Sequence, residues 1–191
     1  MKIRVNRIIK KTKAEGPGVR YCIWFQGCSR HCKGCWARET WSFEAGKEYD
    51  VDEIIEDILS TKGIEGVTFL GGEPFEQTEA LEIIASKVQH AGMSVVCFTG
   101  FRLEEIKTQN CLKYIDLLID GEFRDNEKDY SRPWVGSKNQ RYHFFTERYN
   151  ENILKSKNKI EVRVQKNGLI LFNGMGDFKK LKQKIDMIVK H

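Results

Sequence analysis

Residues 66–100 read G-V-T-F-L-G-G-E-P-F-E-Q-T-E-A-L-E-I-I-A-S-K-V-Q-H-A-G-M-S-V-V-C-F-T-G and contain one strand–helix–strand unit. The runs V-T-F-L and S-V-V-C-F are almost continuously apolar, which is typical of parallel strands covered by helices. Between them, apolar residues recur at the spacing of one helical face: Leu81, Ile84, Ala85 and Val88. Gly92 ends the helical pattern. The stretch therefore predicts an α/β fold.

The same alternation continues on both sides of this unit. R-Y-C-I-W-F-Q-G, residues 20–27, and I-D-L-L-I-D, residues 115–120, are further strand patterns. Residues 51–60 form a helical pattern that Asp50 or Asp52 can cap. Its apolar face is expected to comprise Ile54, Ile55, Ile58 and Leu59. The predicted strands end in G-G-E-P, T-G-F and D-G-E-F, so a ligand site is expected beyond their carboxyl ends.

The pattern changes after this alternating region. Residues 121–141 look irregular and charged, whereas the runs at 141–146 and 160–172 look like strands. Asn167-Gly168 predicts a hairpin within the second run. A basic helix is expected over residues 177–190.

Length and composition indicate one folded domain. The 191 residues are 40% hydrophobic and 31% charged, with three prolines, which excludes an intrinsically disordered chain. We expect a core over residues 1–141 and a C-terminal extension over residues 142–191 that packs on the same domain.

Charge and targeting signals narrow the class of protein. The net charge of +5 comes from 32 basic residues dispersed among 27 acidic ones, so nucleic-acid binding is not expected. No run of about 18 apolar residues and no secretion leader is evident, so we expect a cytoplasmic protein without a membrane partner. Six cysteines in such a chain favour reduced thiols or metal ligands over disulfides.

Three of these cysteines fall within G-C-S-R-H-C-K-G-C-W, residues 27–36. Cys28, Cys32 and Cys35 are separated by three and then two residues, and no fourth thiol follows in the loop. A zinc site would have to use the adjacent His31 and Cys32 on one ion, without the second ligand pair that zinc sites usually have. A [4Fe–4S] cluster held by three thiolates instead keeps one iron open to a small ligand.

The other cysteines and one aromatic run are expected in the core. Cys22, Cys97 and Cys111 lie in apolar strand or helix contexts, where cysteine acts as a small hydrophobic residue. The run His143, Phe144, Phe145 is expected to be buried as well. We therefore assign none of them to a site.

Seven motifs occur in order between residues 15 and 141: E-G-P-G-V-R (15–20), G-C-S-R-H-C-K-G-C-W (27–36), E-T-W (39–41), L-G-G-E-P (70–74), F-T-G-F (98–101), L-I-D-G-E-F (118–123) and W-V-G-S-K-N-Q-R (134–141). In these motifs the chain resembles the radical S-adenosylmethionine superfamily, whose loop has the spacing C-x₃-C-x₂-C. More narrowly, it is similar to the activating proteins of glycyl-radical enzymes, and most of all to the anaerobic ribonucleoside-triphosphate reductase activating protein family.

The resemblance implies a fold and a set of site residues. The implied fold is a partial (β/α) barrel of parallel strands, to which the hairpin and helix patterns described above add a C-terminal extension. Cys28, Cys32 and Cys35 are implied as the catalytic ligands of a [4Fe–4S] cluster, and S-adenosylmethionine as the second cofactor. The implied cofactor-binding residues are Lys33, Gly34, Cys35, Trp36, Gly71, Gly72, Glu73, Pro74, Thr99 and Asp120.

Several of these assignments also have a physical reason or a plain structural alternative. Glu73 offers an acceptor to the ammonium group of S-adenosylmethionine. Gly34 stands where much of the superfamily has an aromatic residue, so the backbone around it is expected at the adenine, with Trp36 packing nearby. Core packing is the alternative role of Trp36, and ordinary caps or turns are the alternative for Thr99 and Asp120.

Three functions follow from these observations. The first is an activase that cleaves S-adenosylmethionine and forms a glycyl radical on a large partner enzyme, such as anaerobic ribonucleotide reductase. A small electron donor such as flavodoxin or ferredoxin would supply the electron. The second is a radical S-adenosylmethionine enzyme that acts on a peptide, nucleotide or other small molecule. The third is a non-catalytic iron–sulfur module for electron transfer.

The irregular loop 121–141 is a candidate for contact with the partner. Trp134 would be its anchor, with Arg132 and Arg141 beside it, since Trp and Arg are enriched at binding hot spots. The alternative is a surface loop packed by its own tryptophan.

Overall fold

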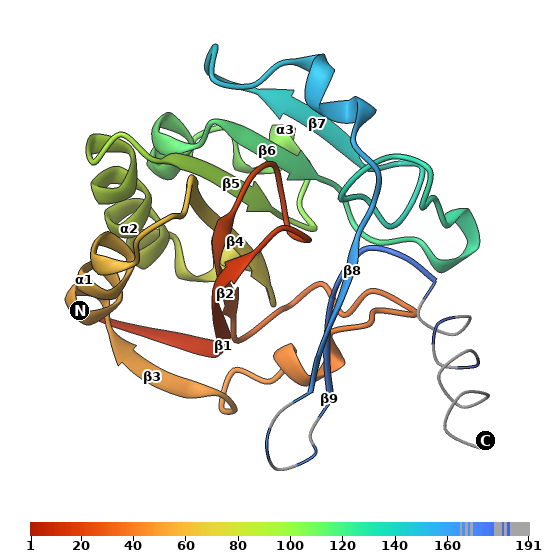
Figure 1. The fold of residues 1–191 in the computed structure, drawn as a ribbon, viewed down its shortest axis with the longest axis horizontal. Helices are drawn as coiled ribbons and strands as arrows, with labels where there is room; N and C mark the ends of the chain where they lie inside the picture. The colour runs from red at the N-terminus through yellow and green to blue at the C-terminus, as the bar shows by residue number, and fades with distance from the viewer. Residues whose placement is uncertain (165, 167, 169, 178–180, 182, 184–191) are drawn as a thin grey trace.

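The computed structural model describes residues 1–164, 166, 168, 170–177, 181 and 183. Over these residues, seven strands form one sheet in the order β3-β1-β2-β4-β5-β6-β7 (Figure 1). The strands are β1 (Lys2–Thr12), β2 (Arg20–Phe25), β3 (Lys47–Asp50), β4 (Gly66–Gly71), β5 (Ser94–Phe98), β6 (Leu117–Asp120) and β7 (Arg141–Phe144). A separate two-stranded hairpin comprises β8 (Ile160–Val164) and β9 (Ile170–Gly174).

The centre of the sheet is parallel, as the sequence predicted. Strands β2, β4, β5 and β6 pair in parallel, whereas β1, β3 and β7 pair antiparallel with their neighbours. The mixed α/β fold is therefore confirmed. A barrel is not confirmed, because the sheet is open and has β3 and β7 at its edges.

Two helices, α1 (Val51–Ser60) and α2 (Thr78–His90), cover one face of the sheet (Figure 1). The other helical segments up to residue 177 are short: α3 (Leu103–Ile106), η1 (Arg38–Thr40), η2 (Pro74–Gln77), η3 (Asn110–Tyr114), η4 (Asp125–Glu127) and η5 (Glu151–Lys155). None of the helices over the described residues is long and apolar enough to cross a membrane.

The first helix begins and packs largely as predicted. The Asp50 carboxylate accepts a hydrogen bond from the backbone N–H of Asp52, which identifies Asp50 as the cap. Ile54, Ile55 and Ile58 are buried. Leu59 was expected on the same face but is 49% exposed, because it lies at the edge of the apolar face of the helix.

Ile58 provides a test of this packing. It is fully buried, so Ile58→Val should lower the free energy of unfolding by about 0.5–1.5 kcal/mol, the usual effect of removing one buried methyl group. Leu59→Ala, one position along on the exposed side, should change it by less than about 0.5 kcal/mol. Urea denaturation measures both. Equal losses in the two variants would mean that α1 packs with a different face inward.

Strand side chains alternate between two apolar layers. Tyr21, Ile23 and Phe25 of β2 join the layer under the helices, together with the predicted α2 residues Leu81, Ile84, Ala85 and Val88. Cys22 and Trp24 point to the opposite face, where they pack with Ile9 and Leu70. Cys22, Cys97 and Cys111 are all buried, as expected. The second face leads to the cavity described below.

Arg20 fixes the amino-terminal end of the parallel strands. Its buried guanidinium donates to Thr68 Oγ1 and Val67 O of β4 and to Ser94 Oγ and O of β5. Tyr149 OH also lies 3.2 Å from its Nη1 atom. One side chain therefore joins three neighbouring strands at the end opposite their carboxyl termini.

Only some of the predictions for the C-terminal extension, residues 142–191, are confirmed. The hairpin is confirmed, since β8 and β9 pair antiparallel with Val164 opposite Ile170. Asn167, and residues 178–180, 182 and 184–190 of the predicted basic helix, lie outside the described residues. Phe145 was expected in the core but is 39% exposed. It follows β7, the strand at the edge of the sheet.

Candidate functional site

The three clustered cysteines lie on a loop that begins where β2 ends. Gly27 N–H donates to Thr40 O over 2.8 Å, and Cys28 N–H donates to Trp41 O over 3.1 Å. These two bonds close the loop at its base. Its sulfur-bearing part is thereby held beside the carboxyl ends of β4 and β5, as expected for ligand sites in α/β folds.

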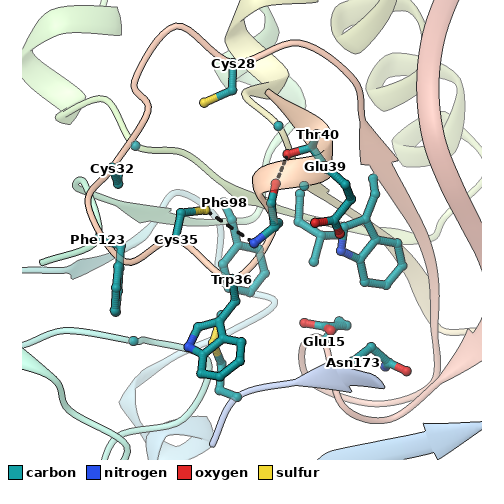
Figure 2. A pocket seen from close by; sticks show the side chains of 18 of the residues that line it. Glu15, Cys28, Cys32, Cys35, Trp36, Glu39, Thr40, Phe98, Phe123 and Asn173 are labelled. Atoms are coloured by element: carbon teal, nitrogen blue, oxygen red, sulfur yellow. Dashed lines mark hydrogen bonds between the residues drawn. The ribbon is translucent and has the colours of Figure 1, made fainter. Parts of the chain in front are cut away.

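A cavity of about 700 Å³ opens beneath this loop (Figure 2). This volume lies in the range of small-molecule and cofactor sites. Of the residues predicted for the site, the structure brings eight to its walls: Cys28, Cys32, Cys35, Trp36, Gly71, Gly72, Glu73 and Thr99. Lys33, Gly34, Pro74 and Asp120 are not among the lining residues.

The three thiols share one wall of the cavity but differ in burial. Cys28 is buried, whereas Cys32 and Cys35 are partly exposed. Burial raises the pKa of the Cys28 and Cys32 thiols, because a buried negative charge is unfavourable. Each thiol therefore needs a bound cation to compensate its charge as a thiolate. Ala37 N–H donates to Cys35 Sγ over 3.4 Å (Figure 2). The donor set is soft and negatively charged when bound, as iron–sulfur clusters require.

No group of three His, Cys, Asp or Glu side chains among the described residues is arranged to hold a single metal ion.

Glu73 is a buried carboxylate that lines the same cavity. Its Oε1 accepts from Phe75 N–H over 3.0 Å and from Thr99 Oγ1 over 2.8 Å, and its Oε2 accepts from Gly100 N–H over 2.8 Å. Burial nevertheless raises the pKa of Glu73 to about 7. A cation in the cavity would stabilise the charged form. Oε2, which has one protein donor, can accept one more hydrogen bond.

Glycines allow the G-G-E-P turn to lie against the cysteine loop. Gly71 has φ of +100°, a conformation that other residues rarely adopt. A Cβ atom on Gly72 would lie 2.4 Å from Gly27 O, which no side chain allows. Glu73 N–H also donates to Gly27 O over 2.8 Å. The turn and the cysteine loop are therefore joined backbone to backbone.

In this structure, Thr99 contacts Glu73, and Asp120 contacts neighbouring protein groups. Thr99 donates to Glu73 and so orients that carboxylate. Asp120 is fully buried and accepts from Leu103 N–H and from Arg141, and it lies 3.1 Å from His143 Nε2. Burial opposes the charge of Asp120, but the hydrogen bonds from Arg141 and Leu103 N–H, together with His143, outweigh it and lower the pKa.

The predicted residues of the cysteine loop also differ in position. Lys33 is exposed. Gly34 has φ of +79°, and a Cβ atom there would lie 2.6 Å from Asp125 Oδ1, so this position favours glycine. Trp36 lines the cavity but is 52% exposed, and its indole points away from the three cysteines (Figure 2). A core role for Trp36 is therefore wrong.

The loop 121–141 is organised by internal contacts. Trp134 is 5% exposed and packs with Val96, Leu117 and Ile119, so it is a core residue and not an exposed anchor. Arg132 donates to the carbonyl oxygens of Gln140, Ser137 and Lys138. The expectation of a Trp-centred interface is therefore wrong, because the left-handed backbone at Trp134, with φ of +60°, turns the indole inward.

Several lining residues were not assigned to the site from the sequence. Arg7, Glu15, Phe98 and Asn173 line the cavity. Glu15 is 3% exposed, and burial raises its pKa to about 7. Its Oε1 accepts from Gly174 N–H of β9. The motif E-G-P-G-V-R contained a signal for Glu15, whereas Asn173 stands in an ordinary strand pattern.

The sequence matches known proteins over most of its length. Residues 14–143 match the family model described as a 4Fe-4S single cluster domain. The anaerobic ribonucleoside-triphosphate reductase-activating protein of Haemophilus influenzae is 36% identical over 141 residues, which cover 69% of this chain and 91% of that protein. The protein of the same name from Enterobacteria phage T4 is 32% identical, and the alignment covers 71% of this chain and 90% of the phage protein. QueE from Escherichia coli superposes with a TM-score of 0.45 at 17% identity, covering 52% of this chain and 53% of QueE.

Proposed function

Because the chain belongs to the family of anaerobic ribonucleoside-triphosphate reductase-activating proteins, we propose that it generates a glycyl radical on an anaerobic ribonucleotide reductase. It is an activating enzyme of the radical S-adenosylmethionine type, as the sequence motifs indicated. The observation that supports the proposal most directly is that Cys28, Cys32, Cys35 and Glu73 line one cavity.

The residues of that cavity have distinct tasks. Cys28, Cys32 and Cys35 would hold a [4Fe–4S] cluster through their thiolates. When bound and reduced, such a cluster would supply the electron that cleaves S-adenosylmethionine into methionine and a 5′-deoxyadenosyl radical, the species that would take a hydrogen atom from glycine. Glu73 would accept a hydrogen bond from the ammonium group of S-adenosylmethionine, and Thr99 Oγ1 and Gly100 N–H hold that carboxylate in place.

The cavity walls supply the remaining requirements. Gly71 and Gly72 bring the backbone of the turn close to the ligand without side chains in the way. Trp24, Leu70 and Phe98 form an apolar wall that excludes water from a reactive radical. A small electron donor such as flavodoxin or ferredoxin is also part of the proposal, because the cluster must be reduced in each reaction.

Electron paramagnetic resonance tests this function. We expect anaerobically reconstituted protein, with S-adenosylmethionine and dithionite, to produce a glycine-centred radical on the anaerobic ribonucleotide reductase of the same organism. The signal should require all components, and 5′-deoxyadenosine should accumulate with it. Formation of 5′-deoxyadenosine without any glycine radical would indicate the alternative, a peptide, nucleotide or other small-molecule substrate.

A further inference from the structure

The β8–β9 hairpin attaches to the domain through its polar side. Thr12 Oγ1 at the end of β1 donates to Glu161 Oε2 over 2.5 Å, and Asn173 Nδ2 donates to both Thr12 Oγ1 and Glu161 Oε2 over 3.1 Å. Arg163 donates to Lys11 O. Glu161 and Asn173 face each other across the two strands, so these contacts belong to one side of the hairpin.

The other side of the hairpin is apolar. Ile160, Val162 and Val164 alternate with the polar residues of β8, and Phe172 and Ile170 lie opposite Val162 and Val164 on β9. Among the described residues, Val162 is 40% exposed, Val164 71% and Ile170 43%, whereas Ile160 and Phe172 are partly buried. We call these five residues the outer hairpin face. Antiparallel sheets usually turn their polar side to water, whereas this side carries three exposed apolar side chains.

The outer hairpin face is continuous with the candidate active site. Ile170 belongs to this face and also lines the cavity, and the half-exposed Trp36 lines the same cavity. Figure 1 shows the hairpin as a separate unit beside the sheet. The hairpin therefore lies beside the cavity that a glycine-bearing segment would have to enter.

The hairpin also lies outside the part of the chain that matches the family model. That match ends at residue 143, whereas β8 begins at Ile160. The alignment with the Haemophilus influenzae protein covers 91% of that protein but 69% of this chain. Catalysis by the shared domain thus gives no reason for an exposed apolar face here, whereas recognition of a partner does.

We propose that the outer hairpin face docks the protein whose glycine is activated in the cavity, through an apolar patch on that protein. This inference rests on the proposed function, because it requires a protein substrate. Exposed branched aliphatic residues next to a catalytic opening bury apolar area on contact, and so hold the partner while its glycine-bearing segment extends inward.

Charged substitutions on this face provide the test. Val162→Lys and Val164→Lys change exposed residues that do not line the cavity. We expect each to raise the KM for the anaerobic ribonucleotide reductase of the same organism, or the Kd of the complex by biolayer interferometry, about tenfold or more. Leu59→Lys is the matched control, since it places the same charge on an exposed leucine of α1 and should leave both constants unchanged.

The outcomes separate this inference from the proposed function. If the wild-type protein forms no glycine radical on the reductase, the proposed function fails. If it forms the radical and both lysine variants bind and react like the wild type, the docking surface is wrong. If the lysine variants melt at a lower temperature but bind the reductase with unchanged affinity, the chain itself covers the face. If the wild-type protein sediments as a dimer and Val164→Lys sediments as a monomer, a second copy of the chain covers it. Either result overturns the inference.

Discussion

Alanine at Cys28, Cys32 or Cys35 is expected to abolish the iron–sulfur cluster. All three thiols line the same cavity. A cluster with only three protein ligands already has one iron without a thiolate, so it should not stay bound when a second thiolate is removed. Anaerobic reconstitution should load about four irons on each wild-type chain and almost none on each variant. Iron content and the visible absorbance of the cluster measure the effect.

The other three cysteines are the internal control for this result. Cys22 and Cys97 are fully buried in strands β2 and β5, and Cys111 is buried in η3. None of them lines the cavity. Cys22→Ala, Cys97→Ala and Cys111→Ala should therefore retain the iron, whatever they do to the melting temperature. Loss of iron from one of these variants, with full loading of a Cys32→Ala protein, would contradict the assigned ligands.

The Glu73→Gln variant should keep the cluster and bind S-adenosylmethionine more weakly by about 1.5–3 kcal/mol. This is the usual range for a hydrogen bond to a charged group, and Gln removes the charge that attracts the ammonium. Isothermal titration calorimetry on the reconstituted protein measures the change. Glu79→Gln, an exposed position on α2, is the matched control and should bind like the wild type.

Glu73 should also give the affinity a pH dependence. Burial raises its pKa to about 7, so the carboxyl gains a proton as the pH falls below 7 and loses its attraction for the ammonium group. Affinity should therefore drop by roughly five- to tenfold between pH 7.5 and pH 6, and this decrease should be absent in Glu73→Gln. An identical pH dependence in both proteins would assign the titration to another group and reject this role for Glu73.

The sequence predicted the features that depend on local patterns. The strand–helix–strand unit at 66–100, the Asp50 cap and the β8–β9 hairpin follow from periodicity and turn chemistry, which act over a few residues. The spacing of the cysteines indicated their shared site, because three thiols on one short loop have little freedom to separate. Glu73 lines the cavity just beyond the end of β4, in the region where a ligand site is expected because parallel strands end at one edge of the sheet.

Features that depend on distant pairing were not predicted. Strands β1 and β3 hold mixed charged and apolar residues, and only their antiparallel pairing with each other and with β2 makes them part of the sheet. The burial of Trp134 depends on a left-handed backbone conformation that no residue-type preference indicates. Asp120 has the expected place at a strand end, but its ion pair depends on Arg141 of the neighbouring strand β7, which lies 21 residues further along the chain.

Arg20 and the cysteine loop lie at opposite ends of the parallel strands, and this separation affects what happens when the protein loses its metal. The buried guanidinium bridges β2, β4 and β5, so the amides of these strands should exchange with deuterium only on global unfolding. The loop is held at the other end, by the bonds of Gly27 and Cys28 N–H to Thr40 O and Trp41 O and by the bond of Glu73 N–H to Gly27 O, so it can open without breaking the contacts of Arg20. Oxygen damage would then leave a folded apoprotein that iron and sulfide can reload, rather than a chain that must be degraded and made again.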